Sequence, residues 1–129
     1  MGGGFDSSGI IPIAVLGPGS DQAIFSVHVQ NNSGTAQSFT AYAECLRATG
    51  AKTAYGPEAP GGVNPGASAG VQATCPVGAL IAGAFVDTGD TFYLYDYSPS
   101  NSSTWQAHLV NPGTVSTVFD LFPQCLSFT

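Results

Sequence analysis

Two histidines, His28 and His108, are the side chains of this sequence best suited to acid–base chemistry near neutral pH. They lie 80 positions apart in a sequence that repeats itself at that spacing. A catalytic pair seldom arises from the duplication of one residue into two related strands. We therefore expect both to be surface or hydrogen-bonded structural residues. A metal site formed by the two imidazoles is the alternative, although no third ligand is evident.

Asp87 and Asp90 flank a Thr-Gly pair, a combination that is common in turns. Two carboxylates so placed could hold Ca²⁺ together with backbone carbonyl groups, but we favour an ordinary turn. The sequence contains no glycine-rich phosphate loop and no HExxH zinc motif. We expect no catalytic residue, no metal and no cofactor, and therefore a protein that is not an enzyme.

Three cysteines, Cys45, Cys75 and Cys125, are too far apart in the sequence for a CxxC metal site. All three are candidates for a disulfide. We expect one disulfide and one buried thiol, without a preference for which two residues pair. Three reduced cysteines, buried as small apolar residues, are the alternative.

Residues 92–97, with the sequence FYLYDY, form the most aromatic segment of the chain. Strand alternation places Tyr93, Tyr95 and Tyr97 on one face and Phe92 on the other. If Phe92 enters the core, the tyrosines line a surface, where tyrosine is a favoured contact residue. We predict that they contact a partner. The alternative is that they pack beneath a covering loop.

A second predicted contact lies in residues 1–20, which we interpret as an extended N-terminal arm before a single domain at 21–129. The arm combines glycine-rich flanks with an apolar stretch. It either folds back as an edge strand of its own domain or adds a strand to a neighbouring subunit. The candidate contact residues of this arm are Ile10, Ile11, Ile13, Val15 and Leu16.

The elements that would position these residues include an internal duplication. Shifted by 80 positions, residues 25–46 match residues 105–126 without a gap, within the two predicted hairpin segments 23–46 and 104–126. In each copy, two segments of alternating polarity flank a turn that contains Asn and Gly, so we predict two related β-hairpins. The matched pairs include Phe25 and Trp105, His28 and His108, Asn31 and Asn111, Phe39 and Phe119, and Cys45 and Cys125.

Short β-prone segments separated by Gly and Pro predict an all-β protein. Further strands are expected at 71–75, 80–85 and 91–97. The Gly- and Pro-rich residues 47–70 are expected to form a long loop, with an irregular strand near 51–55. We predict an antiparallel β-sandwich, jelly-roll or immunoglobulin-like, of about eight strands.

The charge balance excludes several kinds of partner. Only two cations, Arg47 and Lys52, oppose eight carboxylates. Nucleic acid and anionic membrane surfaces, which require clustered Lys and Arg, are therefore excluded. The longest apolar stretch, 10–16, is far shorter than the ~20 residues of a membrane-spanning helix. The charged share of 8% favours an extracellular or virion-surface protein over a cytosolic enzyme.

Several motifs occur in a fixed order along the chain: AYAEC at 41–45, CPVG at 75–78, YSP at 97–99, then Trp105 and a last strand that closes at Cys125. This order resembles a three-cysteine "CPxG" β domain of secreted actinobacterial proteins and some of their phages. Two segments depart from the family pattern, because AGA at 82–84 replaces a triple glycine and the final tail is FPQC at 122–125. The resemblance implies no catalytic residue. It implies an extracellular or virion-associated structural or binding module.

These observations predict a non-catalytic structural component of a surface assembly, such as a phage decoration or tail-associated protein or an extracellular filament subunit. Its partners would be copies of itself, in a homo-oligomer, or other subunits of the assembly. The alternative is a monomeric extracellular module that binds carbohydrate or protein, with Tyr93, Tyr95 and Tyr97 as a stacking platform.

Overall fold

In the computed structural model, residues 2–7, 13–18, 25–31, 34–45 and 48–128 are described, and they form ten β-strands and no helix. Every described strand pairing is antiparallel, which confirms the predicted all-β sandwich with slightly more strands than expected. Within these ranges, no helix could cross a membrane. The strands are β1 (Gly2–Ser7), β2 (Ile13–Pro18), β3 (Phe25–Val29), β4 (Phe39–Glu44), β5 (Ala51–Tyr55), β6 (Ala59–Val63), β7 (Ser68–Thr74), β8 (Leu80–Pro99), β9 (Thr104–Val110) and β10 (Thr117–Phe128).

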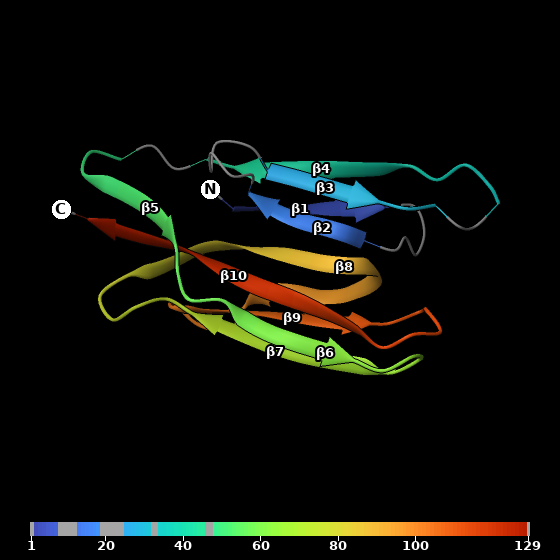
Figure 1. Cartoon of the computed structure of the whole chain (residues 1–129). Helices are drawn as coiled ribbons and strands as arrows, with labels where there is room; N and C mark the ends of the chain where they lie inside the picture. The colour runs from blue at the N-terminus through green and yellow to red at the C-terminus, as the bar shows by residue number, and fades with distance from the viewer. Residues whose placement is uncertain (1, 8–12, 19–24, 32–33, 46–47, 129) are drawn as a thin grey trace.

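The core lies between two layers that share the long strand β8 (Figure 1). In one layer, residues 80–88 of β8 pair with β10, which also pairs with β5 and β6. In the other layer, residues 93–99 of β8 pair with β9, which also pairs with β7. The buried hydrophobic residues between the layers are Val63, Ala73, Ala84, Val86, Phe92, Ala107, Leu109, Phe119 and Leu121.

The turn predicted at Asp87–Asp90 is wrong, because these residues continue β8 without a break. Asp87 lies opposite Asp120, and Thr88 lies opposite Phe119, in the ladder between β8 and β10. Pairing with a neighbouring strand overrides the local turn preference of Asp and Gly. The calcium-binding turn considered from the sequence therefore does not form.

The region 47–70 is more ordered than its composition predicts. The strand expected near 51–55 is confirmed as β5, but β6 was not predicted. The sequence of β6 is APGGV, which has low β propensity. It forms a strand because Gly61 lies opposite Phe119 of β10 and leaves space for the phenyl ring.

The prediction of two hairpins is wrong, although the strands of both repeats form. In the described part of the chain, β3 pairs with β2 and β4 pairs with β1, and neither pairs with the other. In the second copy, β9 pairs with β7 and β8, whereas β10 pairs with β5, β6 and β8. In each copy, the two repeated strands therefore belong to different strand ladders and do not pair with each other.

The duplication includes strands that the sequence comparison did not align. β1 pairs with β4, and the first half of β8 pairs with β10, in the same relative register. Phe39 lies opposite Ser7, and its counterpart Phe119 lies opposite Thr88. Counterparts are thus 80 positions apart between β4 and β10, and 81 positions apart between β1 and β8.

The remaining ladders of the two copies share a β-bulge at the same place. In the pairing of β2 with β3, the extra residue is Ala14, directly before the residue opposite His28. In the pairing of β8 with β9, it is Tyr95, directly before the residue opposite His108. Ala14 and Tyr95 are again 81 positions apart. Because a bulge is a specific local feature, its presence in both copies indicates that a whole four-segment unit is duplicated.

We call β1–β4 (residues 2–44) the first unit and β8–β10 (residues 80–128) the second unit. Figure 1 shows β1–β4 grouped in the upper part of the molecule and β6–β10 in the lower part, with β5 at the left beside the C-terminal end of β10. The strands between the units, β5–β7 (residues 51–74), we call the completing strands. All of their described pairings are with the second unit: β5 and β6 with β10, and β7 with β9.

Candidate interaction surfaces

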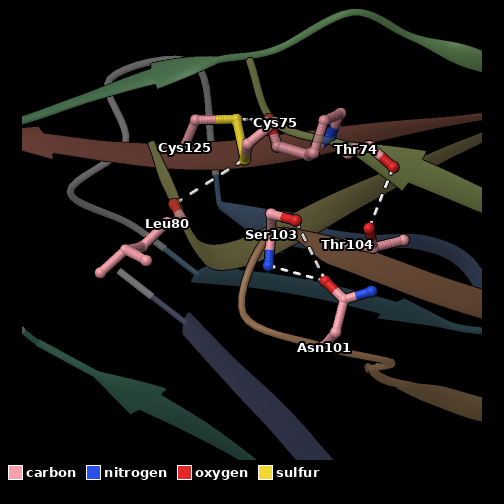
Figure 2. Close-up of a disulfide and its surroundings, with 8 residues drawn as sticks. Thr74, Cys75, Leu80, Asn101, Ser103, Thr104 and Cys125 are labelled. Atoms are coloured by element: carbon pink, nitrogen blue, oxygen red, sulfur yellow. Dashed lines mark hydrogen bonds between the residues drawn. A yellow bond between two sulfur atoms is a disulfide. The ribbon is translucent and has the colours of Figure 1, made fainter. Parts of the chain in front are cut away.

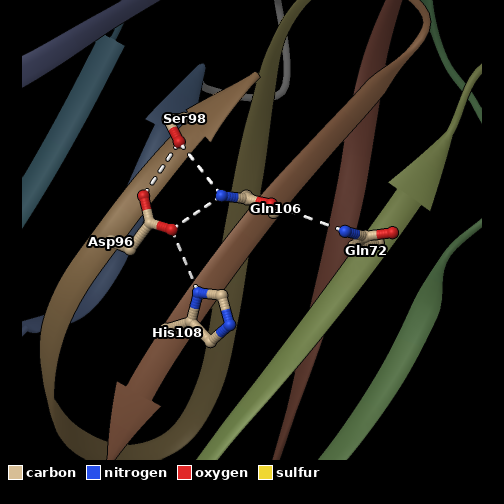
Figure 3. A network of polar contacts seen from close by, with 5 residues as sticks. All are labelled: Gln72, Asp96, Ser98, Gln106 and His108. Atoms are coloured by element: carbon tan, nitrogen blue, oxygen red, sulfur yellow. Dashed lines mark hydrogen bonds and ion pairs between the residues drawn. The ribbon is translucent and has the colours of Figure 1, made fainter. Parts of the chain in front are cut away.

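A row of polar side chains crosses the outer face of the layer formed by β7, β9 and the second half of β8 (Figure 3). Asp96 is at its centre. One of its carboxylate oxygens accepts a hydrogen bond from Ser98 Oγ at 2.8 Å. The other accepts a hydrogen bond from Gln106 Nε2 at 2.7 Å and lies 3.0 Å from His108 Nδ1. Gln72 Nε2 donates to Gln106 Oε1 at 3.4 Å and extends the row to β7.

The order of these contacts differs from that of a serine hydrolase, in which histidine lies between serine and carboxylate. Here Ser98 donates its hydroxyl hydrogen to Asp96, so the serine is not activated by His108. The hydrogen bond from Ser98 is the main cause that lowers the pKa of Asp96; partial desolvation opposes the shift, and His108 and Gln106 reinforce it. The row therefore presents a carboxylate, amides and an imidazole as a hydrogen-bonding surface.

A glycine allows His108 to occupy this row. Gly70 on β7 lies opposite His108, and a Cβ at Gly70 would lie 2.5 Å from His108 Cδ2. The residue fell in the predicted long loop, so no sequence signal identified it. In the first unit, His28 is exposed and lies opposite Val15, where the second unit has a carboxylate. Among the described residues, no group of three His, Cys, Asp or Glu side chains is arranged to hold a metal ion.

The prediction that three tyrosines of β8 share one surface is wrong for Tyr97. The bulge at Tyr95 reverses the alternation, so Asp96 takes the outward position and Tyr97 turns inward. The ring of Tyr97 packs against the core, 5.0 Å from the ring of Trp105 in a T-shaped arrangement.

The hydroxyl of Tyr97 donates a hydrogen bond to the carbonyl of Ala84, and burial raises the pKa of this phenol. Tyr93 is half-buried, and the side chain of Tyr95 lies outside the described part of the structure. A stacking platform of three tyrosines is therefore not formed.

Cys75 and Cys125 form a disulfide that joins the end of β7 to β10 (Figure 2). Cys45 is a free and exposed thiol. The N–H of Cys75 donates to the carbonyl of Ser103 at 2.8 Å. One predicted disulfide is confirmed, and the predicted burial of the remaining thiol is wrong. The disulfide fits an extracellular or other non-cytoplasmic protein.

β4 is exposed at positions where its counterpart β10 is buried. Phe119 is 1% exposed, but Phe39 is 45% exposed. Leu121 is fully buried, whereas Ala41 is exposed. Tyr42, on the other face of β4, is 52% exposed. We call Phe39, Ala41, Tyr42 and the adjoining strand edge the β4 surface; sequence reasoning did not find it, because the same pattern is buried in the second copy.

The predicted N-terminal arm supplies β1 and β2. The backbone of β2 pairs with β3 on one side and with β8 on the other, so in this structure it folds back within its own chain. Ile13, Val15 and Leu16 lie in β2, and Ile10 and Ile11 lie outside the described residues. The pairing with β8 joins the first unit to the second.

Comparisons of the chain with protein-family models, curated proteins and solved structures gave no match. The resemblance to the "CPxG" domain therefore stays a prediction. The β4 surface differs from its counterpart in the same chain, because Phe39 is 45% exposed whereas Phe119 is 1% exposed.

Proposed function

We propose that the protein is a non-catalytic structural component of a surface assembly and contacts a neighbouring subunit through the β4 surface. The assembly is a phage virion, with the chain as a decoration or tail-associated protein, or an extracellular filament. The observation that carries this proposal is the exposure of Phe39 and Tyr42, 45% and 52%, on opposite faces of one edge strand.

An edge strand offers a row of N–H and C=O groups that can pair with another strand. In the described part of the chain, β4 pairs with β1 alone, so its other edge is open. Natural edges are commonly protected by charged residues or proline, yet β4 contains no proline and a single charged residue, Glu44, at its last position. Exposed aromatic side chains beside an open edge are typical of a protein–protein contact.

The composition of the chain supports a surface location. Only 8% of its residues are charged, so its exterior is formed mostly by uncharged polar and small residues. The Cys75–Cys125 disulfide is stable in an oxidising environment, as outside a cell or on a particle. Both features agree with an exterior structural role.

Self-association tests this proposal. We expect the molar mass of the full chain, measured by size-exclusion chromatography with light scattering, to rise with protein concentration. The double variant Phe39→Ser/Tyr42→Ser should remain monomeric under the same conditions. Val77→Ser is the matched control, because Val77 is an exposed apolar residue in a turn away from β4. A wild-type chain that is monomeric at every concentration would contradict self-association through the β4 surface.

A second candidate function, binding of a carbohydrate, is supported by the polar row around Asp96. Amide and carboxylate groups of Asp96, Gln106 and Gln72 lie side by side across three strands, as hydrogen-bonding partners for hydroxyl groups would. A glycan array probed with wild-type protein and with Gln106→Ala tests this function. Binding that is lost in the variant, by a chain that stays monomeric, would favour it over assembly.

A further inference from the structure

We infer that the first unit is an acceptor for an extended polypeptide segment with the chemistry of residues 51–75, supplied by a different subunit of the assembly. This inference rests on the proposed role of β4 and names the partner that the β4 surface takes. The second unit serves as the template, because the same four segments occur there with their completing strands in place.

Both units carry the same phenylalanine, Phe39 in the first and Phe119 in the second. In the second unit, β6 pairs with residues 117–121 of β10, and Gly61 lies opposite Phe119. The phenyl ring lies so close to Gly61 that a Cβ there would come within 3.0 Å of it. In the first unit, no described strand covers Phe39, which is 45% exposed. The incoming segment therefore needs a glycine opposite Phe39.

The equivalent cysteines of the two units also differ. Cys125 is bonded to Cys75, the residue that follows β7, and is 6% exposed. Cys45, the counterpart of Cys125, is exposed and carries a free thiol. A completing segment that docked on the first unit as β5–β7 dock on the second would bring its own cysteine beside Cys45. The free thiol thus fits the same architecture as the exposed phenylalanine.

The two units also differ in the pairing at their other edge, which is β9 in the second unit and β3 in the first. In the second unit, β7 pairs with β9 along its whole length, from Ser68 opposite Val110 to Thr74 opposite Thr104. In the first unit, the counterpart of β9 is β3, and its described pairing is with β2 alone. Among the described residues, no strand therefore pairs with the outer edges of β3 and β4, where the second unit has β7 on one edge and β5 and β6 on the other.

Copies of this chain cannot fill these edges by exchanging their own strands. Each chain has two units and one set of completing strands, which is already held by the Cys75–Cys125 disulfide. A chain that gave its β5–β7 to a neighbour would open its own second unit. The occupant is therefore a separate segment of the same kind, with small and apolar residues in alternation and a cysteine after its last strand.

A peptide of residues 51–76 of this chain is the probe, because it contains β5–β7 and the single cysteine Cys75. Its Cys75 is prepared as a mixed disulfide with 2-thiopyridine. Attack of the Cys45 thiolate on the peptide sulfur forms the Cys45–peptide disulfide and releases pyridine-2-thione, so no outside oxidant is needed. The rate of thione release, with mass spectrometry of the product, measures docking on the intact full chain.

We expect this peptide to couple to Cys45 about tenfold or more faster than a peptide of scrambled sequence, because docking raises the local concentration of the disulfide. A Gly61→Val peptide should couple at the scrambled rate, since its side chain would occupy the place of the Phe39 ring. The Cys45→Ser protein should not couple at all. Equal rates for the matched and scrambled peptides would overturn the inference, as would an unimpaired Gly61→Val peptide.

The two proposals fail in different ways. Self-association through Phe39 and Tyr42 without uptake of the peptide would support the proposed function and contradict this inference. A chain that stays monomeric but couples selectively to the matched peptide would support the acceptor site and contradict self-association through β4. Disulfide-linked dimers of the chain that form through Cys45 faster than peptide coupling would identify a second copy as the occupant, against the inference.

Discussion

The phenyl ring of Phe119 lies directly against Gly61 of the neighbouring strand β6. Because a Cβ at this position would lie less than 3.0 Å from three atoms of the buried ring, Gly61→Ala forces the ring or β6 to move. We expect the free energy of unfolding to fall by about 1–3 kcal/mol, as for other overpacked cores. Equilibrium denaturation in urea measures this change.

The neighbouring glycine provides the control. A Cβ at Gly62 would meet no atom closer than 3.9 Å, and Gly62 is exposed on the same strand. Gly62→Ala should change the free energy of unfolding by no more than about 0.5 kcal/mol. Equal destabilisation by the two substitutions would mean that β6 resists any added side chain and that contact with Phe119 is not the cause.

The buried hydroxyl of Tyr97 leads to a second prediction. Tyr97→Phe removes the donor to the Ala84 carbonyl and leaves that acceptor unsatisfied, so we expect a loss of about 1–2 kcal/mol in the free energy of unfolding. Tyr93→Phe, at a half-buried tyrosine of the same strand, should have a smaller effect. If Tyr93→Phe destabilises the protein more than Tyr97→Phe, the inward orientation of Tyr97 is wrong.

Burial of the same phenol also affects stability in alkali. The pKa of Tyr97 is raised in the folded state, so the folded protein favours the neutral phenol. This contribution is fully present below the ordinary tyrosine pKa of about 10 and is lost as the pH rises toward the folded value. The free energy of unfolding of the wild type should therefore fall above about pH 10 more steeply than that of Tyr97→Phe.

The sequence predicts the positions of strands that depend on a local alternation of polarity. Alternating polarity correctly located β3 and β4 and their counterparts in β9 and β10, and the strand near 51–55 also formed. Which strands pair depends on contacts between distant residues, so the hairpins were wrong. The surface of tyrosines failed for a similar reason, because a single bulge residue, Tyr95, reverses the alternation after it.

The sequence does not reveal the β4 surface, because the repeat gives β4 and β10 the same local pattern. Phe39 and Phe119 have the same local pattern, and no property of either residue tells that one is buried and the other exposed. The difference comes from β6, a glycine-rich strand that pairs with β10 and has no described counterpart on β4. Only the arrangement in space distinguishes the two units.

Asp96 provides a fourth prediction, on acid sensitivity. Its pKa is lowered in the folded protein, chiefly by the hydrogen bond from Ser98, so its stabilising contribution is present above about pH 4 and is lost as the pH falls through the folded value. Ser98→Ala should move the pKa of Asp96 toward its ordinary value, as followed by NMR titration of the carboxyl carbon. Ser116→Ala, which removes a hydroxyl bonded to Asn64, is the control and should leave the Asp96 titration unchanged. An Asp96 titration that is the same in Ser98→Ala and wild type would refute the assigned cause.

The disulfide leads to the last prediction, which separates the roles of the three cysteines. Cys75 and Cys125 are 50 residues apart, so their bond removes a large loop-closure entropy from the unfolded chain. In the chain-entropy model this amounts to roughly 4 kcal/mol, and we expect the double variant Cys75→Ser/Cys125→Ser to lose most of it in urea denaturation. Cys45→Ser removes an exposed thiol that is not part of the bond, so the isolated chain should keep its stability within about 0.5 kcal/mol. Because Cys45 is the counterpart of Cys125, a large loss in Cys45→Ser would mean that this thiol already has a structural partner within the isolated chain, and the first unit would then need no segment from outside.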